Sequence, residues 1–328
     1  RDWSSDVCSS DLRTMGTADT VTKAYMRENA VFADAFNYLL YDGRPVIEPE
    51  KLKELDTTEI TLPFGKDGTE DAVQKYRDIL KSAVIMQDEK ASYMLLGIEN
   101  QTDIHYAMPV RNMIYDALQY GKQVSDLSAR HRRENEKQHT RGEYLSGFYK
   151  ADKIIPVITL VVHFGADAWD GALSLHEMMD VQDETLLRFI PDYRIQLIDP
   201  ARLSAEDLNK LSTSLREVMG YIKYSRSKEK LTEFLNETPR EWIEANAARV
   251  IKAITKTPIE IPDGAEAVNV CEAIEAMMKD SKDEGRAEGK MEALAGLVKD
   301  GLLSIQDAAA RLNMTAAEFE AAMKKLAS

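Results

Sequence analysis

The chain has 328 residues, enough for about two domains of ordinary size. Hydrophobic residues make up 44% and charged residues 30%, which is a globular composition and excludes collagen-like and wholly disordered proteins. The formal net charge is −14, so the chain is too acidic to coat nucleic acid non-specifically, and any such contact requires a local basic patch. No run of about 18 uninterrupted apolar residues occurs, so no membrane span is expected.

The first fourteen residues, RDWSSDVCSSDLRT, differ in character from the rest of the chain. They contain a near-repeat of Ser-Ser-Asp, lack the apolar core of a signal peptide, and resemble translated sequencing-adaptor sequence. Residues 1–14 are therefore expected to be a non-native leader, with Met15 as the start. The two cysteines, Cys8 and Cys271, cannot form a disulfide framework or a zinc site, which favours a reducing, cytoplasmic location and an inert buried thiol at Cys271.

The front half of the chain mixes helical and strand patterns. Residues 20–42 are predicted to form one helix, because large apolar side chains recur on one face and Gly43 follows. Residues 46–72 are polar and predict a surface connection with one short helix near Glu50–Leu55. The further elements expected are strands at Asp78–Met86 and Ala91–Glu99 around a turn at 87–90, a helix from Pro109 towards Val124, a charged insertion at 126–150, and strands at Ile154–Phe164 and Tyr193–Ile198.

Beyond Ser204 the pattern is helical throughout. The order helix–strand–strand–helix–strand, followed by helices alone, predicts an α/β part with a mixed sheet and an all-helical C-terminal region. Ser304 with Asp307, and Thr315 with Glu318, have the spacing of helix capping boxes. The expected divisions are 15–200, a helical extension at 201–262 and a helical tail at 263–328, with helices at 204–222, 226–236, 239–257, 267–299, 304–312 and 315–327.

Two acidic residues stand out in the predicted hairpin. If its turn is centred between Asp88 and Glu89, Asp78 lies directly opposite Glu99, with Cβ atoms about 5 Å apart on one face. Opposed carboxylates repel unless a cation lies between them, and Mg²⁺ or Mn²⁺ is a fitting cation because hard ions prefer oxygen ligands. Gln101 follows on the same face. The alternative is a pair of solvent-facing carboxylates at strand ends, because a one-residue slip of the turn destroys the alignment.

Five segments of the chain occur together in one characteristic order. The segments are Asn29–Asn37, Tyr76–Asp78, Leu95–Gln101, Met108–Arg111 with Tyr115–Asp116, and Pro156–Gly165. Together they resemble the Rpn family of recombination-promoting nucleases, often labelled transposases, which belongs to the PD-(D/E)xK nuclease superfamily. The resemblance covers roughly residues 15–200 and, more loosely, Asp283–Lys290.

The resemblance implies a restriction-endonuclease-like core and a Mg²⁺-dependent DNA endonuclease linked to recombination or mobile elements. Asp78 and Glu99 would match the catalytic acids and metal ligands, and Gln101 would occupy the catalytic position that Lys fills in much of the superfamily. Glutamine can form hydrogen bonds but carries no charge. Many relatives have an acid at the position of Asn29, which we expect on the inward face of its helix, whereas Asp34 is expected to face solvent.

An alternative is a catalytically inactive DNA-binding or protein-interaction member of the same fold, which the Gln at 101 and the Asn at 29 favour. Arg111 and Tyr115 share a helix face, where they could hold phosphate and orient the metal ligands, or simply stack to pack the helix on the sheet. We expect His163 to be a satisfied buried histidine.

The remaining expectations concern partners. Arg130, Arg132 and Arg133 form the most basic stretch of the chain, which could bind DNA phosphates beside the site or be a solvated loop. The C-terminal helices are a candidate oligomerisation arm, so DNA and a second copy of the chain are the expected partners, and a membrane is not.

Overall fold

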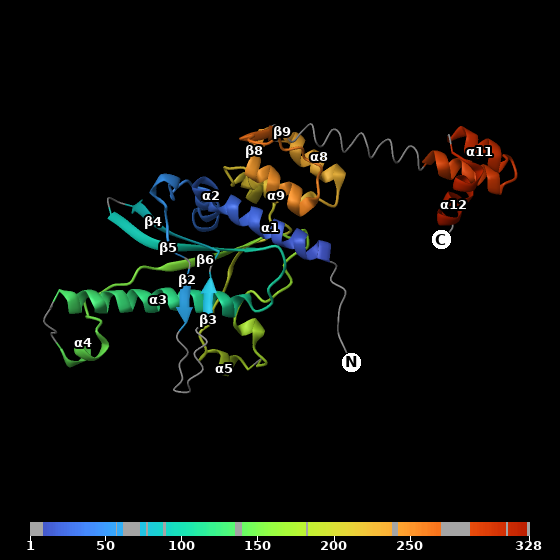
Figure 1. Ribbon diagram of the computed structural model, residues 1–328. Helices are drawn as coiled ribbons and strands as arrows, with labels where there is room; N and C mark the ends of the chain where they lie inside the picture. Colours follow the sequence, from blue (N-terminus) through green and yellow to red (C-terminus); the bar gives the residue numbers. More distant parts are fainter. Residues whose placement is uncertain are drawn as a thin grey trace. The chain divides into compact units, whose positions relative to one another are not determined.

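The computed structural model describes residues 9–56, 58–61, 73–76, 78–87, 90–134, 140–181, 183–237, 242–269, 289–312 and 314–326. The chain divides into two compact units, Arg1–Val268 and Asn269–Ser328 (Figure 1). Expectations for residues 1–8, Cys271 and residues 283–288 lie outside the described residues. Within the described ranges, no helix combines the length and the apolar character needed to cross a bilayer.

The first unit is built on a mixed sheet, as the sequence predicts, with β1 as a fifth strand that the sequence pattern did not reveal. Strands β1, β4 and β5 are antiparallel neighbours, and β5, β6 and β7 are parallel neighbours, in the order β1-β4-β5-β6-β7. Strand β6 is almost fully buried, as expected for a β-branched strand covered on both faces. The strands are β1 (Lys53–Glu54), β4 (Ile79–Gln87), β5 (Lys90–Gln101), β6 (Val157–His163) and β7 (Gln196–Ile198).

The β4–β5 hairpin has the predicted register. Gln87 pairs with Lys90 at the turn, and Ile79 pairs with Ile98 at the open end. Asp78, immediately before β4, therefore stands opposite Glu99. The short turn fixes this alignment, since loop length sets the register of a hairpin.

Two helices replace the single helix predicted at residues 20–42. Helix α1 (Ser9–Arg27) and helix α2 (Asn29–Tyr41) are separated by Glu28, whose backbone is extended. The ammonium group of Lys81, on β4, donates hydrogen bonds to the Arg27 carbonyl and to Asn29 Oδ1. Lys81 is only 1% exposed and its pKa is lowered by burial, so it needs these acceptors, and they are available only where the helix is interrupted.

The expected orientations of Asn29 and Asp34 are wrong. Asn29 is exposed and donates to the Pro49 carbonyl, whereas Asp34 is only 3% exposed. The Asp34 carboxylate accepts hydrogen bonds of 2.7–3.1 Å from the amide and hydroxyl groups of Ser212 and Thr213. Helix α2 is buried continuously from Val31 to Asn37. It therefore has no solvent-exposed face at Asp34, and helical periodicity cannot predict which side chains there are exposed.

Helix α3 (Met108–Arg133) is longer than predicted and includes the first part of the expected charged insertion. Its last turn carries Arg130, Arg132 and Arg133, whose positive charges complement the negative end of the helix dipole. Of the two alternatives left open for this basic stretch, the solvated loop is therefore wrong, and the DNA contact stays a prediction.

The short helix predicted near Glu50–Leu55 is a single 3-10 turn, η1 (Pro49–Lys51), and β1 lies in the rest of that range. Shorter elements that the sequence pattern did not reveal are a hairpin of β2 (Thr58–Thr61) with β3 (Val73–Tyr76), α4 (Arg141–Ser146), η2 (His176–Met178) and α5 (Glu184–Leu187).

Residues beyond 200 pack on the first helices of the chain. Helix α9 packs against α1 and α7, and α7 also contacts α2. The predicted helix at 204–222 is interrupted because Asp34 holds the backbone amides of Ser212 and Thr213. The elements are α6 (Ala205–Asn209), α7 (Leu215–Tyr224), α8 (Lys228–Glu237), β8 (Trp242–Glu244), α9 (Ala245–Thr255) and β9 (Ala267–Asn269), where helix had been predicted at both short strands.

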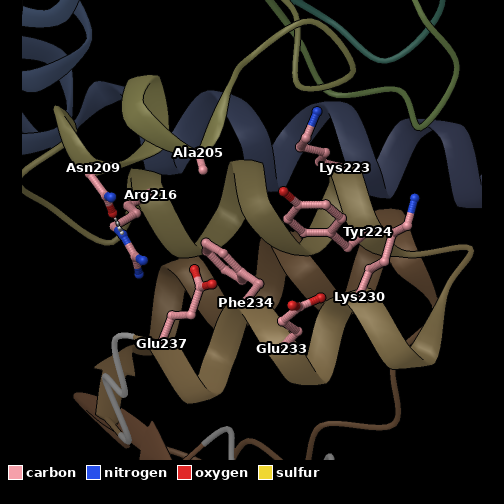
Figure 2. A pocket seen from close by; sticks show the side chains of 9 residues that line it. All are labelled: Ala205, Asn209, Arg216, Lys223, Tyr224, Lys230, Glu233, Phe234 and Glu237. Carbon is pink, nitrogen blue, oxygen red and sulfur yellow. Dashed lines mark hydrogen bonds between the residues drawn. The ribbon is translucent and has the colours of Figure 1, made fainter.

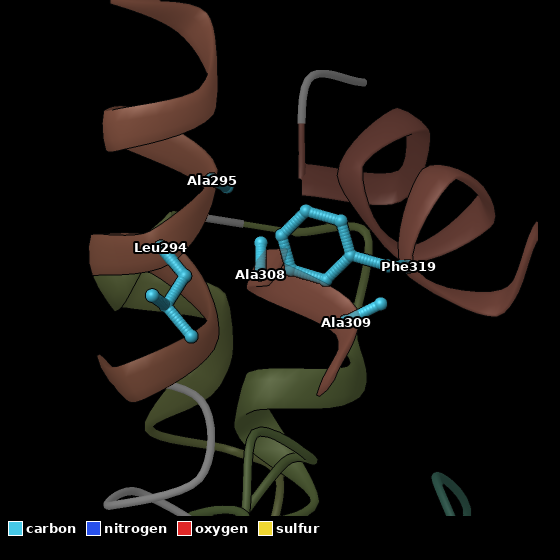
Figure 3. Close-up of a cluster of buried hydrophobic side chains, with 5 residues drawn as sticks. All are labelled: Leu294, Ala295, Ala308, Ala309 and Phe319. Carbon is cyan, nitrogen blue, oxygen red and sulfur yellow. The ribbon is translucent and has the colours of Figure 1, made fainter. Parts of the chain in front are cut away.

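The second unit is a small helical cluster. Residues 289–299 are helical and are followed by α11 (Ile305–Arg311) and α12 (Ala316–Leu326). The predicted capping box of Thr315 and Glu318 forms, with Glu318 N donating to Thr315 Oγ1 and Thr315 N donating to Glu318 Oε2, and Ser304 caps α11 by accepting a hydrogen bond from Asp307 N. The buried side chains shown in Figure 3 are Leu294, Ala295, Ala308, Ala309 and Phe319.

The Asp34 carboxylate is expected to contribute strongly to the stability of the first unit. Asp34→Asn places amide hydrogens against the donors of Ser212 and Thr213, so we expect the free energy of unfolding to fall by about 3 kcal/mol. Urea unfolding followed by tryptophan fluorescence measures this, because the second unit contains no tryptophan. Asp42→Asn, at an exposed helix end, is the control and should change stability by less than about 0.5 kcal/mol. Equal effects of the two variants would contradict this role.

Candidate active site at the open end of the β4–β5 hairpin

The predicted acidic pair meets where β4 begins and β5 ends. The backbone amide of Asp78 donates to Glu99 Oε1 at 3.3 Å, and the amide of Asn100 donates to Asp78 Oδ2 at 2.8 Å. Each carboxylate thus accepts a hydrogen bond from the backbone of the opposite strand. The Glu99 side chain is fully buried and that of Asp78 is 11% exposed, so the pair opens to solvent on the Asp78 side.

Helix α3 supplies a cation to Glu99. Glu99 lies beside Val161 of β6, and Val161 packs against Met108 at the start of α3. One turn further along α3, Arg111 Nη2 lies 3.0 Å from Glu99 Oε2, and Arg111 Nε donates to the Tyr115 hydroxyl at 3.1 Å. The predicted shared face is confirmed, and the Arg111–Tyr115 pair both packs on the sheet and holds Glu99.

The charges of this group are well defined at neutral pH. Burial opposes the positive charge of Arg111, but Glu99 and Tyr115 outweigh it, and its pKa is raised. Burial, followed by the nearby Glu99 charge, also raises the pKa of Tyr115. The Tyr115 phenol therefore stays protonated and accepts the guanidinium hydrogen bond as a neutral group.

Helix α1 supplies a second cation, which the sequence patterns did not reveal. Lys23 Nζ lies 3.1 Å from Asp78 Oδ1 and 2.8 Å from Asp19 Oδ2. Burial lowers the pKa of Lys23, but the two carboxylates more than compensate and the net shift is upward. Lys23 therefore stays charged at neutral pH. In the sequence, Asp19 and Lys23 are four residues apart and are indistinguishable from an ordinary solvated helix pair.

Gln101 lies at the end of β5, two residues beyond Glu99 and on the same face of the strand. Its backbone carbonyl accepts a hydrogen bond from Phe164 N and lies 3.2 Å from His163 Nδ1. His163 Nε2 lies 3.0 Å from the Asp167 carbonyl, and a neutral imidazole can donate to one of these two carbonyls, so His163 is buried with a hydrogen-bond partner, as expected.

Two groups of predicted residues lie away from the acidic pair. Asn29 is bonded to Lys81, which is three positions along β4 from Asp78 and therefore faces the opposite side of the sheet. Arg130 follows Arg111 by 19 positions on α3, which at about 1.5 Å per residue is roughly 28 Å along the helix axis. The basic end of α3 therefore does not adjoin the acidic pair.

The donor set suits a hard divalent ion with few protein ligands. Mg²⁺ is commonly held by one or two carboxylates and keeps several waters, and Asp78 and Glu99 are two such ligands. The buried side-chain amide of Asn100 has no hydrogen-bond partner among the described residues, but Asn100 directly follows Glu99 on β5 and its side chain therefore faces the other side of the sheet. No group of three or more acidic, His or Cys side chains placed to hold a metal occurs in the described ranges.

A cavity of about 400 Å³ lies elsewhere in the first unit, between α6, α7 and α8 (Figure 2). Arg216 at its wall contacts Glu217 at 3.0 Å and Asn209 at 3.3 Å, and its guanidinium lies over the Phe234 ring. None of the predicted site residues lines this cavity, and the Arg216 charge is matched within the protein.

Comparison with known families agrees with the resemblance found in the sequence. The family model described as "Putative transposase, YhgA-like" matches residues 48–249, more than half of the chain, and the chain belongs to this family. The match includes the β4–β5 hairpin and α3 and ends within α9, whereas α1 and α2 precede it. No curated protein and no solved structure matched the chain.

The Arg111–Glu99 ion pair is expected to be necessary for stability as well as for the shape of the site. Arg111→Met leaves the fully buried Glu99 carboxylate without this guanidinium, so we expect a loss of about 3 kcal/mol in the free energy of unfolding. Adding Glu99→Gln should restore much of the loss, which tryptophan-detected urea unfolding would measure. Arg130→Met, at the exposed end of α3, is the control, and a similar loss there would rule out a specific role for the pair.

Proposed function

We propose that this protein is a Mg²⁺-dependent DNA endonuclease of the PD-(D/E)xK type that serves recombination or a mobile element. The observation that carries the proposal is the opposition of Asp78 and Glu99 across the β4–β5 ladder. Membership of a transposase family supports DNA as the substrate. The mixed sheet, with the acidic pair at the end of a hairpin beside a packed helix, supports the nuclease type.

Each side chain of the site has a separate role in the proposed reaction. Asp78 and Glu99 would hold the metal ion, and Arg111 with Tyr115 keeps Glu99 in its rotamer. The chemistry supplied by bound Mg²⁺ is polarisation of a phosphoryl oxygen and a lower pKa for a bound water. Gln101, on the same face as Glu99, would orient the attacking water by hydrogen bonding. Mn²⁺ would serve in the same place, since it also prefers oxygen ligands.

A second candidate function is a catalytically inactive DNA-binding or protein-interaction member of the family. The observation that favours it is that all four carboxylate oxygens already face protein donors, namely Lys23, Arg111 and the backbone amides of Asp78 and Asn100. The uncharged Gln101 also favours the inactive alternative. The basic end of α3, with Arg130, Arg132 and Arg133, is a candidate DNA contact under either function.

Plasmid nicking tests the first proposal. With Mg²⁺ present, the wild-type protein should convert supercoiled plasmid to nicked and linear forms, and Asp78→Asn and Glu99→Gln should each slow this at least about a hundredfold, since each removes one carboxylate charge from the metal site. Asp126→Asn, an exposed carboxylate on α3, is the matched control and should cleave like the wild type. Equal cleavage by all four proteins would assign the activity to a contaminant or to another site.

Thermal melting with Mn²⁺ separates the two functions. A metal that binds only the native state must raise the melting temperature, so the nuclease is expected to be stabilised by Mn²⁺ and Asp78→Asn is not. The inactive alternative predicts no metal-dependent shift together with retention of plasmid DNA in a gel-shift experiment. Stabilisation that persists in Asp78→Asn would place the metal away from the acidic pair.

A further inference from the structure

The position of Lys23 suits a larger role than fixing α1 to the sheet. Its ammonium group lies 3.1 Å from Asp78 Oδ1, on the carboxylate that remains partly open to solvent. We propose that Lys23 supplies, from helix α1, the positive charge that Gln101 cannot carry, and that it faces the scissile phosphate once a divalent ion binds Asp78. This inference rests on the proposed nuclease function.

Helix α1 holds Lys23 in place from several sides. Thr22, Tyr25 and Met26 are fully buried, and the Tyr25 hydroxyl lies 2.9 Å from Ser214 Oγ. Asp19, one turn before Lys23, pairs with its ammonium at 2.8 Å. The buried residues fix the backbone of α1, and the ion pairs with Asp19 and Asp78 hold the Lys23 ammonium, on a side chain that is 37% exposed, in the folded protein before any substrate binds. Lys23 is therefore preorganised beside Asp78.

Lys23 and a divalent ion are attracted to the same oxygen. While the ammonium lies on Asp78 Oδ1, it competes with a metal for that ligand. Once a metal ion has taken the oxygen, the ion pair with Asp19 would keep Lys23 beside the site. Its ammonium is then free to approach a phosphate oxygen, where a preorganised cation stabilises the negative charge that develops during hydrolysis.

The competition between Lys23 and the metal ion predicts opposite changes in metal affinity and in cleavage rate. Removing the Lys23 charge should strengthen metal binding, because a competitor is lost, and weaken cleavage, because the cation at the phosphate is lost. A residue that only docks α1 on the sheet would alter neither quantity, or would reduce both together through loss of structure. The opposite signs of the two effects therefore distinguish the proposal from a packing role.

The experiment uses the full chain and Mn²⁺ as the probe. For Lys23→Gln we expect the dissociation constant of Mn²⁺, measured by titration calorimetry, to fall at least about threefold, and plasmid nicking to slow about a hundredfold. Lys23→Arg keeps the charge and should cleave faster than Lys23→Gln. Lys122→Gln is the matched control, because Lys122 also pairs with an aspartate four residues away, and it should resemble the wild type in both measurements.

A rescue variant completes the test. Lys23→Gln combined with Gln101→Lys returns a positive charge to the open end of the hairpin, from the strand instead of the helix, and should recover at least about tenfold of the lost nicking rate. Melting temperatures near the wild-type value would show that the variants are folded.

The possible failures can be told apart. If the wild type nicks DNA and Asp78→Asn does not, but Lys23→Gln nicks at the wild-type rate, the inference about Lys23 is overturned and the nuclease function stands. Unchanged Mn²⁺ affinity in Lys23→Gln overturns the competition in the same way. Absence of nicking by the wild type overturns the nuclease function, and the inference about Lys23 with it.

Discussion

The arrangement of this site depends on one constraint: the β4–β5 register places two carboxylates opposite each other at the open end of a hairpin. Like charges in this position repel, and burial of Glu99 increases the cost. The surrounding elements offset that repulsion, with Arg111 reaching Glu99 from α3 and Lys23 reaching Asp78 from α1. The site therefore joins the sheet to the helices on both of its faces, and Figure 1 shows α1 and α3 on either side of the sheet.

The helical residues beyond 200 help to keep this arrangement rigid. Tyr25 ties α1 to Ser214, and Asp34 ties α2 to Ser212 and Thr213, so the segment just before α7 fixes both N-terminal helices. The family match, which begins at residue 48 and ends at 249, includes that segment but neither α1 nor α2. The C-terminal boundary of the nuclease-like part, expected near residue 200, and the separate helical extension stay predictions.

The hairpin and its acidic pair could be predicted from the local sequence, because a short turn sets the register of a hairpin and side chains alternate along strands. The same rules failed for Asn29 and Asp34, since helical periodicity identifies an inward face only when the other face meets solvent, and α2 is buried around Asp34. Lys23 was missed because its partner Asp78 is 55 positions away in the sequence, and no local pattern reports so distant a contact.

The central claim is that Asp78 and Glu99 together hold a divalent ion. A crystal structure of the protein with Mn²⁺ tests it most directly, because the anomalous scattering of manganese locates the ion without reference to activity. The account predicts one anomalous peak with an oxygen ligand from each of Asp78 and Glu99, at about 2.0–2.3 Å, and water in the remaining positions. An anomalous peak elsewhere, or none between these two side chains at saturating Mn²⁺, would contradict it.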